Sequence, residues 1–333
     1  MSSAYTPSQL TTYLSHISFP SSPSLPLPQT LQTLSTLHTH QISTIPYENL
    51  SLHYSPTHQI RLDPQLLFEK FVGKDGGNGK PGGNGRGGYC MENSIFFNHV
   101  LRGLGFRAYL AGARIRLRGS DGVPGGEFTG WRHIVNIITL PDGSKYMSDV
   151  GFGGDGATKP LPLLPDGQAT HNSIGTQEIR LIHDFIPGQT ERDDESRKLW
   201  IYQYRNGEGM DWNSFYCFPE VEFLEADFEV VNYYTGTHPV ESFQVRTVLV
   251  VKFLMDRGEE GGRDGEGGTG TGIYGKVMMV NGDVKMNLGG KTSVVKRCRT
   301  EEERIEALRE YFGIVLTEEE REGIRGWTTE LRG

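Results

Sequence analysis

The chain has 333 residues, a formal net charge of −8 at pH 7, 36% hydrophobic residues and 44 glycines. This length favours two or three domains, and the composition is typical of a globular protein with long loops. The acidic balance argues against nucleic acid or an anionic membrane as the main partner.

The distribution of apolar residues indicates neither a membrane span nor a secretion signal. No segment approaches the roughly eighteen consecutive apolar residues of a membrane span, and the stretch from Met1 to Phe19 lacks a basic cluster before an apolar core. The three cysteines, Cys90, Cys217 and Cys298, are odd in number and lack Cys-x-x-Cys spacing. We therefore expect a cytoplasmic protein with neither a disulfide framework nor a bound metal.

Helical patterns occupy residues 1–106. Thr6-Pro7-Ser8-Gln9 predicts a helix start with a capping box, and a leucine stripe predicts a second helix over 27–37. Asp63-Pro64 predicts the start of a third helix, and a fourth is expected over 91–104. This part of the chain is interpreted as a helical bundle.

From Arg107 the apolar period changes to two, which is typical of a strand. Further strands are expected at 133–140, 145–150, 198–204 and 212–218. The turn-rich segments between them favour a mainly antiparallel sheet or small barrel over 107–220.

The last third has a mixed pattern. A helix is expected at 223–234, and strands at 245–254 and 273–280. Asn281-Gly282 predicts a hairpin turn, and Thr300 predicts a helix start with Glu303 as its capping-box partner.

Cys90 is the first candidate for chemistry. It follows the glycine run from Gly85 to Gly88 and stands at the start of a helix, where unpaired N–H groups stabilise an anion and should lower the thiol pKa. The alternative is a buried cysteine that only packs. Gly83, Gly85 and Gly88 also match a dinucleotide fingerprint, but no strand precedes them, so this reading fails.

One predicted hairpin, with Pro141-Asp142-Gly143 as its turn, carries a candidate base, His133, and a candidate orienting acid, Asp149. If the loop has three residues and Gly143 is left-handed, Asp149 faces Val135 and lies diagonal to His133 on the same face. A two-residue turn would place Asp149 on the other face. With Asp149 on one ring nitrogen of His133, the other nitrogen could take the proton of Cys90.

Four motifs in order carry a resemblance: Ile45–Leu50, Arg86–Asn93, Thr129–His133 and Asp149–Gly153. By them the chain resembles the arylamine N-acetyltransferases. The resemblance implies an α+β fold with a cysteine-protease-like Cys-His-Asp core in three domains. These are a helical bundle over 1–106 with the catalytic cysteine, a β-barrel over 107–220 with the histidine and aspartate, and an α/β lid over 221–333.

The resemblance also implies the reaction. Cys90 would take an acyl group from acyl-coenzyme A as a thioester and pass it to an arylamine, hydrazine or similar amine, as in xenobiotic metabolism, with His133 and Asp149 completing the triad. Coenzyme A would be a co-substrate, with no permanently bound cofactor. Acetyl-coenzyme A is the first choice of donor, and propionyl- and malonyl-coenzyme A remain open.

Binding residues follow from the resemblance by position. Thr129 and Gly130 would contact the coenzyme. The substrate pocket would be lined by Tyr47, Arg132, His133 and Phe152. Arg86 would pair with Glu48 and tie the cysteine loop to the helical bundle.

Some features depart from the family pattern. The glycine-rich stretches 74–84 and 256–272 are longer than the family core needs and could reshape the coenzyme entrance. Tyr47 adds a hydroxyl where phenylalanine is common. The arginines Arg114, Arg116 and Arg132 could favour a carboxylated acyl group, although solvated strand faces also explain them.

Two other functions remain open. A cysteine hydrolase or transglutaminase-like enzyme would use the same triad, and water access to the pocket separates it from a transferase. A binding protein with a dead site is the alternative from another class, but all three triad residues are present.

Overall fold

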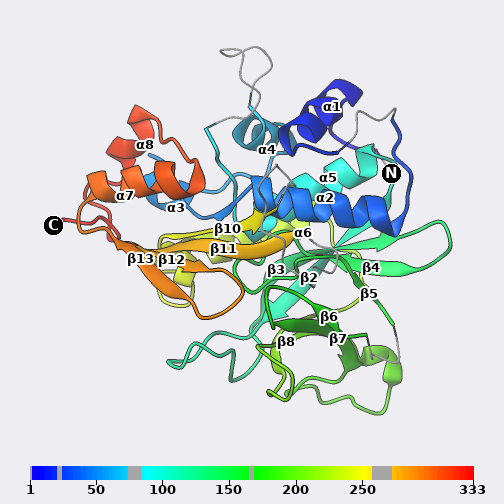
Figure 1. Ribbon diagram of the computed structural model, residues 1–333. Helices are drawn as coiled ribbons and strands as arrows, with labels where there is room; N and C mark the ends of the chain where they lie inside the picture. The colour runs from blue at the N-terminus through cyan, green and yellow to red at the C-terminus, as the bar shows by residue number, and fades with distance from the viewer. Residues whose placement is uncertain (1, 21–24, 74–83, 165–168, 257–271) are drawn as a thin grey trace.

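The computed structural model describes residues 2–20, 25–73, 84–164, 169–256 and 272–333. Two antiparallel sheets form its centre, and the helices of the first part of the chain gather over one side of them (Figure 1). The fold is therefore α+β, as expected. Most of both glycine-rich stretches, 74–83 and 257–271, lies outside the described residues.

The first part of the chain supplies five helices. They are α1 (Pro7–His16), α2 (Leu31–Thr44), α3 (Ser51–Tyr54), α4 (Pro64–Phe71) and α5 (Cys90–Gly103). The capping box expected at the start of α1 is confirmed, since Thr6 and Gln9 bond each other's backbone N–H groups. The second helix was expected from Leu27, which is wrong: Thr30 caps α2, and Leu27 is buried just before the helix, where Pro28 interrupts the pattern.

The larger sheet has eight strands in the order β5-β4-β3-β2-β9-β8-β7-β6. They are β2 (Arg107–Ile115), β3 (Trp131–Thr139), β4 (Lys145–Ser148), β5 (Leu161–Pro162), β6 (His171–Asn172), β7 (Glu178–Asp184), β8 (Leu199–Arg205) and β9 (Asn213–Phe218). In the described ranges β5 and β6 form the two edges and do not pair with each other. The mainly antiparallel sheet is confirmed, and among the described residues it forms a curled half-barrel where a β-barrel was expected. Pro162, which has no N–H to donate, suits an edge strand.

The β3–β4 hairpin has the predicted register. Leu140 donates its N–H to Ser144 O at 2.9 Å, and Gly143 is left-handed with φ of 88°. Asn136 lies opposite Ser148, the last residue of β4. The three-residue loop is confirmed, and one further step along this register brings Asp149 opposite Val135.

The smaller sheet has five strands in the order β1-β10-β11-β12-β13. They are β1 (Tyr47–Glu48), β10 (Leu249–Met255), β11 (Ile273–Val280), β12 (Asp283–Asn287) and β13 (Ser293–Arg297). The Asn281-Gly282 turn between β11 and β12 is confirmed. The strand expected from Val245 begins later, at Leu249, because residues 243–245 form a helical turn. Because β1 comes from the first part of the chain and β10 to β13 from the last third, this sheet joins two parts of the chain that are far apart in sequence.

Three further helices cover the sheets: α6 (Glu225–Thr237), α7 (Glu301–Ala307) and α8 (Glu318–Gly323). The expected helix at 223–234 corresponds to α6. Thr300 caps α7 as predicted, but the Glu303 carboxylate accepts from the N–H of Arg299 instead of that of Thr300. The predicted capping box is therefore only half formed.

The largest hydrophobic core crosses all three predicted domains, since it contains Ile95, Ile134 and Val251 together. The boundaries at 106/107 and 220/221 stay predictions. Among the helices of the described residues, none is long and apolar enough to cross a membrane.

Candidate active site

Cys90 is the first residue of α5, at the end of the glycine run. The Glu92 carboxylate accepts the N–H of Tyr89 at 3.0 Å and so fixes the helix start at this residue. Gly87 is required because a Cβ there would lie 1.8 Å from Pro46 O. The run can therefore pack against β1, which holds the buried Cys90 next to the smaller sheet.

His133 and Asp149 meet as the hairpin register predicts. Nε2 of His133 lies 2.7 Å from Oδ2 of Asp149, and both residues are buried. The N–H of Gly151 donates to the other carboxylate oxygen, Oδ1, at 3.0 Å. With Asp149 accepting from Nε2–H, Nδ1 is the ring nitrogen that can take a proton.

The thiol pKa differs from the sequence-based expectation. Burial raises the pKa of Cys90 well above its ordinary value, and the charge of Asp149 adds to the rise. The backbone N–H groups of Met91 and Cys90 lower it, as the helix start predicted, but they are the weaker effect. The expected low pKa of Cys90 is thus wrong. For the thiol to ionise, a neighbouring base has to take up its proton.

A small cavity of about 50 Å³ brings the predicted side chains together. Its lining consists of Tyr47, Cys90, Ile115, Arg132, His133, Gly151, Phe152, Tyr234, Thr235, Glu241, Ser242, Phe243 and Gln244. Asp149 lies behind His133 and lines a neighbouring cavity. Thr129 and Gly130 lie outside this lining, just before β3, and Gly130 is exposed.

Aromatic packing fixes the imidazole. The ring of Phe152 meets that of His133 edge-on, with centroids 4.9 Å apart, and Phe215 braces Phe152 from the other side at 4.5 Å. A Cβ at Gly151 would lie 2.9 Å from Cys90 Cα, so a glycine is needed where this loop passes the nucleophile. The Asp149–Gly153 motif therefore both orients His133 and makes room for Cys90.

An ionic cluster lies under the cysteine loop. Arg86 donates from Nε to Glu48 at 2.9 Å, which confirms the expected pair, and Lys70 lies 2.7 Å from Glu92. Burial opposes ionisation of Glu48, yet Arg86 and Lys70 hold its pKa below the usual value. Burial raises the pKa of Glu92. These charges bind the glycine run to β1 and α4.

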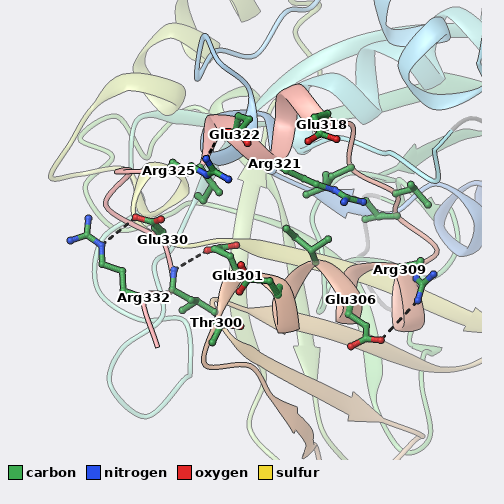
Figure 2. A pocket seen from close by; sticks show the side chains of 17 residues that line it. Thr300, Glu301, Glu306, Arg309, Glu318, Arg321, Glu322, Arg325, Glu330 and Arg332 are labelled. Atoms are coloured by element: carbon green, nitrogen blue, oxygen red, sulfur yellow. Dashed lines mark hydrogen bonds and ion pairs between the residues drawn. The ribbon is translucent and has the colours of Figure 1, made fainter.

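A second cavity, of about 800 Å³, lies between α7, α8 and the C-terminal residues (Figure 2). Some of its charged side chains form ion pairs: Glu322 with Arg325 at 2.8 Å, Glu330 with Arg332 at 3.2 Å and Glu306 with Arg309 at 3.9 Å. Over the described ranges, no three His, Cys, Asp or Glu side chains gather as a metal site requires. The cavity at Cys90 is therefore the better candidate for chemistry.

Comparison with known proteins agrees with this geometry. The family model described as N-acetyltransferase matches residues 30–259, which is most of the chain and includes Cys90, His133 and Asp149. The chain belongs to the arylamine N-acetyltransferase family. Among its relatives, the N-malonyltransferase FDB2 of Fusarium pseudograminearum is 34% identical over 84% of this chain and 77% of that protein. FDB2 of Gibberella moniliformis is 33% identical over 96% of this chain and 92% of that protein.

Other relatives carry the acetyltransferase name. The arylamine N-acetyltransferase of Escherichia coli is 30% identical over 65% of this chain and 64% of that protein. The solved arylamine N-acetyltransferase of Salmonella typhimurium superimposes with a TM-score of 0.72 at 24% identity, over 96% of this chain and 98% of that one. The Mycobacterium marinum enzyme in complex with CoA superimposes with a TM-score of 0.71 at 21% identity, over 97% of this chain and 99% of that one. At such identities the structural likeness shows the fold alone.

Part of the pocket at Cys90 could not be found from sequence motifs. Tyr234 and Thr235 come from α6, and residues 241–244 come from the turn that follows it. The Gln244 side chain donates to the hydroxyl of Tyr47, while the Nδ2 of Asn49 donates to Gln244 O at 3.0 Å. The extra hydroxyl expected from Tyr47 is thus paired within the protein. No local pattern marks residues 241–244, because only the fold brings them to Cys90.

Proposed function

We propose that this member of the family transfers an acyl group from acyl-coenzyme A to an arylamine, hydrazine or similar amine, through a thioester on Cys90. The observation that carries the proposal is the cavity that Cys90 shares with His133, whose Nε2 is held 2.7 Å from Asp149. A buried thiol beside an oriented imidazole is the arrangement that nucleophilic acyl transfer needs.

The first half-reaction follows from the protonation states. Since burial opposes a free thiolate, the Nδ1 of His133 takes the thiol proton as Cys90 Sγ attacks the thioester carbonyl, and Asp149 stabilises the imidazolium. The Sγ–carbon bond forms and the carbon–sulfur bond to coenzyme A breaks. The coenzyme sulfur leaves with the proton from His133.

The second half-reaction runs the same proton path in reverse. The amine nitrogen attacks the acyl carbon on Cys90 and loses a proton to His133, which returns it to the departing sulfur. The amide product and the free thiol result. One imidazole thus serves both halves, and the two substrates occupy the site in turn.

The relatives favour malonyl-coenzyme A as the donor. The two FDB2 proteins, named N-malonyltransferases, match over most of the chain, whereas the Escherichia coli acetyltransferase matches over 65% of it. We therefore rank malonyl above acetyl, which reverses the order suggested by the motifs alone. The CoA complex of the Mycobacterium marinum enzyme supports coenzyme A as a co-substrate.

The remaining binding roles are proposed from position. Thr129 and Gly130 would contact the coenzyme outside the cavity, where a Cβ added at Gly130 would meet nothing within 4 Å. Tyr47 and Phe152 would wall the amine site, since both line the cavity with Cys90.

Hydrolysis by the same triad has less support. The cavity of about 50 Å³ holds only a few water molecules, and an acyl-cysteine shielded from water survives until an amine arrives. The test is to incubate the protein with malonyl-coenzyme A, with and without an aromatic hydrazine, and follow free coenzyme thiol. We expect sustained release only with the hydrazine. Equal sustained release without any amine would identify a hydrolase.

A further inference from the structure

Of the three arginines that the sequence offers for a carboxylated acyl group, one lines the cavity at Cys90. Arg114 stacks on the ring of Trp131, 3.9 Å from its centroid, and Arg116 donates from Nε to Gly126 O at 2.8 Å. Neither lines the cavity at Cys90. Arg132 does line it, and its backbone oxygen lies 3.8 Å from the sulfur of Cys90.

The guanidinium of Arg132 is held from one side. Nη2 donates to the hydroxyl of Tyr234 at 2.9 Å, and Nη1 donates to the backbone oxygen of Glu241 at 3.1 Å. The guanidinium also lies 4.9 Å from the centre of the Tyr234 ring. α6 and the turn after it therefore orient this cation at the wall of the cavity.

The carboxylate partner of Arg132 is weakly bound. Oε2 of Glu241 lies 3.4 Å from Nη2, a long distance for a charge-assisted bond, and no second carboxylate contact makes the pair bidentate. The Glu241 side chain is 53% exposed, while that of Arg132 is only 13% exposed. Because the Glu241 carboxylate stays largely in solvent, its long contact with Arg132 adds little stability, and another carboxylate can replace it at small cost.

We infer that Arg132 is a specificity-determining residue that binds the free carboxylate of a dicarboxylic acyl group, and that the Glu241 carboxylate occupies this place until the acyl group arrives. The inference rests on the proposed function. In a malonyl thioester the carboxylate stands one methylene beyond the reacting carbonyl, so an acyl group on Cys90 carries it toward the cavity wall. The planar fork of an arginine fits a carboxylate with two parallel bonds.

Displacement of Glu241 also gives the acyl group room. Glu241 lines the cavity of about 50 Å³, so its movement into solvent widens the space beside Cys90. A neutral acyl group has no carboxylate that could replace that of Glu241, so it leaves the Arg132–Glu241 pair in place. The site should therefore distinguish acyl groups by charge as well as by size.

The test compares two acyl donors with the same arrangement of heavy atoms along the acyl chain. Isovaleryl-coenzyme A carries two methyl groups where malonyl-coenzyme A carries two carboxylate oxygens. Acylation of Cys90 is measured for both, without amine, in the wild type, Arg132→Met, Arg132→Lys, Glu241→Gln and, as matched control, Arg116→Met. The readout is the malonyl-to-isovaleryl ratio of the second-order acylation rates.

The wild type is expected to prefer malonyl. Arg132→Met should lower the ratio by about 10- to 100-fold, the usual effect of losing hydrogen bonds to a charged group, and Arg132→Lys should restore part of it. Glu241→Gln should raise the ratio several-fold. Arg116→Met should leave it unchanged.

Two results would overturn the inference. One is an unchanged ratio in Arg132→Met; the other is an equal fall for both donors, which would make Arg132 a positioning residue for His133. If Arg132→Met does not fold, the malonyl-to-isovaleryl ratios of the wild type and of Glu241→Gln test the inference instead. A wild-type preference for isovaleryl refutes the inference by itself. Acylation by isovaleryl alone would leave the proposed thioester chemistry intact, whereas no acylation by any donor would refute the proposed function too.

Discussion

Replacing Asp149 by asparagine should nearly stop the reaction without unfolding the protein. Oδ1 of Asp149 accepts the N–H of Gly151 at 3.0 Å, and Oδ2 accepts from Nε2 of His133 at 2.7 Å. In Asp149→Asn the amide oxygen keeps the Gly151 bond, so the amide NH₂ faces Nε2. His133 must then accept at Nε2 and carry its proton on Nδ1, where it cannot take the proton of Cys90.

The magnitude follows from this tautomer. The wrong tautomer in a comparable triad costs about 10⁴-fold, and we expect a loss of about 10³- to 10⁴-fold in Cys90 acylation, or roughly 4 to 5.5 kcal/mol in the barrier. A smaller effect opposes it, because the charge of Asp149 raises the Cys90 pKa and its removal favours the thiolate. The proton-transfer defect should dominate, since a thiolate without an acid cannot protonate the leaving coenzyme.

The assay is single-turnover acylation by malonyl-coenzyme A, followed by rapid quench and intact-protein mass. Thermal unfolding shows whether the variant is folded. The matched control is Asp142→Asn at the exposed tip of the same hairpin, which should acylate like the wild type. A folded Asp149→Asn that keeps more than about a tenth of the wild-type rate would refute the proton path.

Three further outcomes are expected. Burial raises the pKa of both Cys90 and Cys217, but iodoacetamide should alkylate Cys90 faster than Cys217 because His133 can take the proton of Cys90. Equal labelling would argue against a base at Cys90. Initial rates at several amine concentrations should give parallel double-reciprocal lines against acyl-coenzyme A, while intersecting lines would indicate a ternary complex. Partial burial raises the pKa of Asp155, whose side chain is 20% exposed, but Lys276 and Arg118 hold this pKa at about 2, against 3.8 in the unfolded chain. Asp155 therefore contributes about 2 kcal/mol of stability above pH 3.8, which is lost as the pH falls towards 2. Denaturant titrations of Asp155→Asn should show a flatter acid decline than the wild type, and identical slopes would contradict this assignment.

Local patterns predicted the parts of the fold that depend on nearby residues. The turn at Gly143 allowed two loop lengths, and the three-residue loop that the structure has is the one that places Asp149, just after β4, on the face of His133. The start of α5 at Cys90 likewise follows from the glycine run and the Glu92 carboxylate, which are adjacent in sequence.

Features that depend on distant residues were not predictable in this way. The pKa of Cys90 is set mainly by burial beneath other parts of the chain, which outweighs the helix start. The turn 241–244 is held at the cavity by residues far away in sequence, since Asn49, His53 and Tyr47 all bond to Gln244. The mainly antiparallel sheet was predicted correctly, but the sequence did not show that its described strands form a half-barrel, because the edge strands β5 and β6 have only two residues each.

The central claim is that Cys90 carries the acyl group between the two substrates. Its most direct measurement is the mass of the intact protein after mixing with malonyl-coenzyme A alone, with peptide mapping of the adduct. We predict one malonyl group per chain, located on Cys90, lost on addition of an aromatic hydrazine and absent from Cys90→Ser. An adduct on another residue, or full turnover by folded Cys90→Ser, would contradict the account.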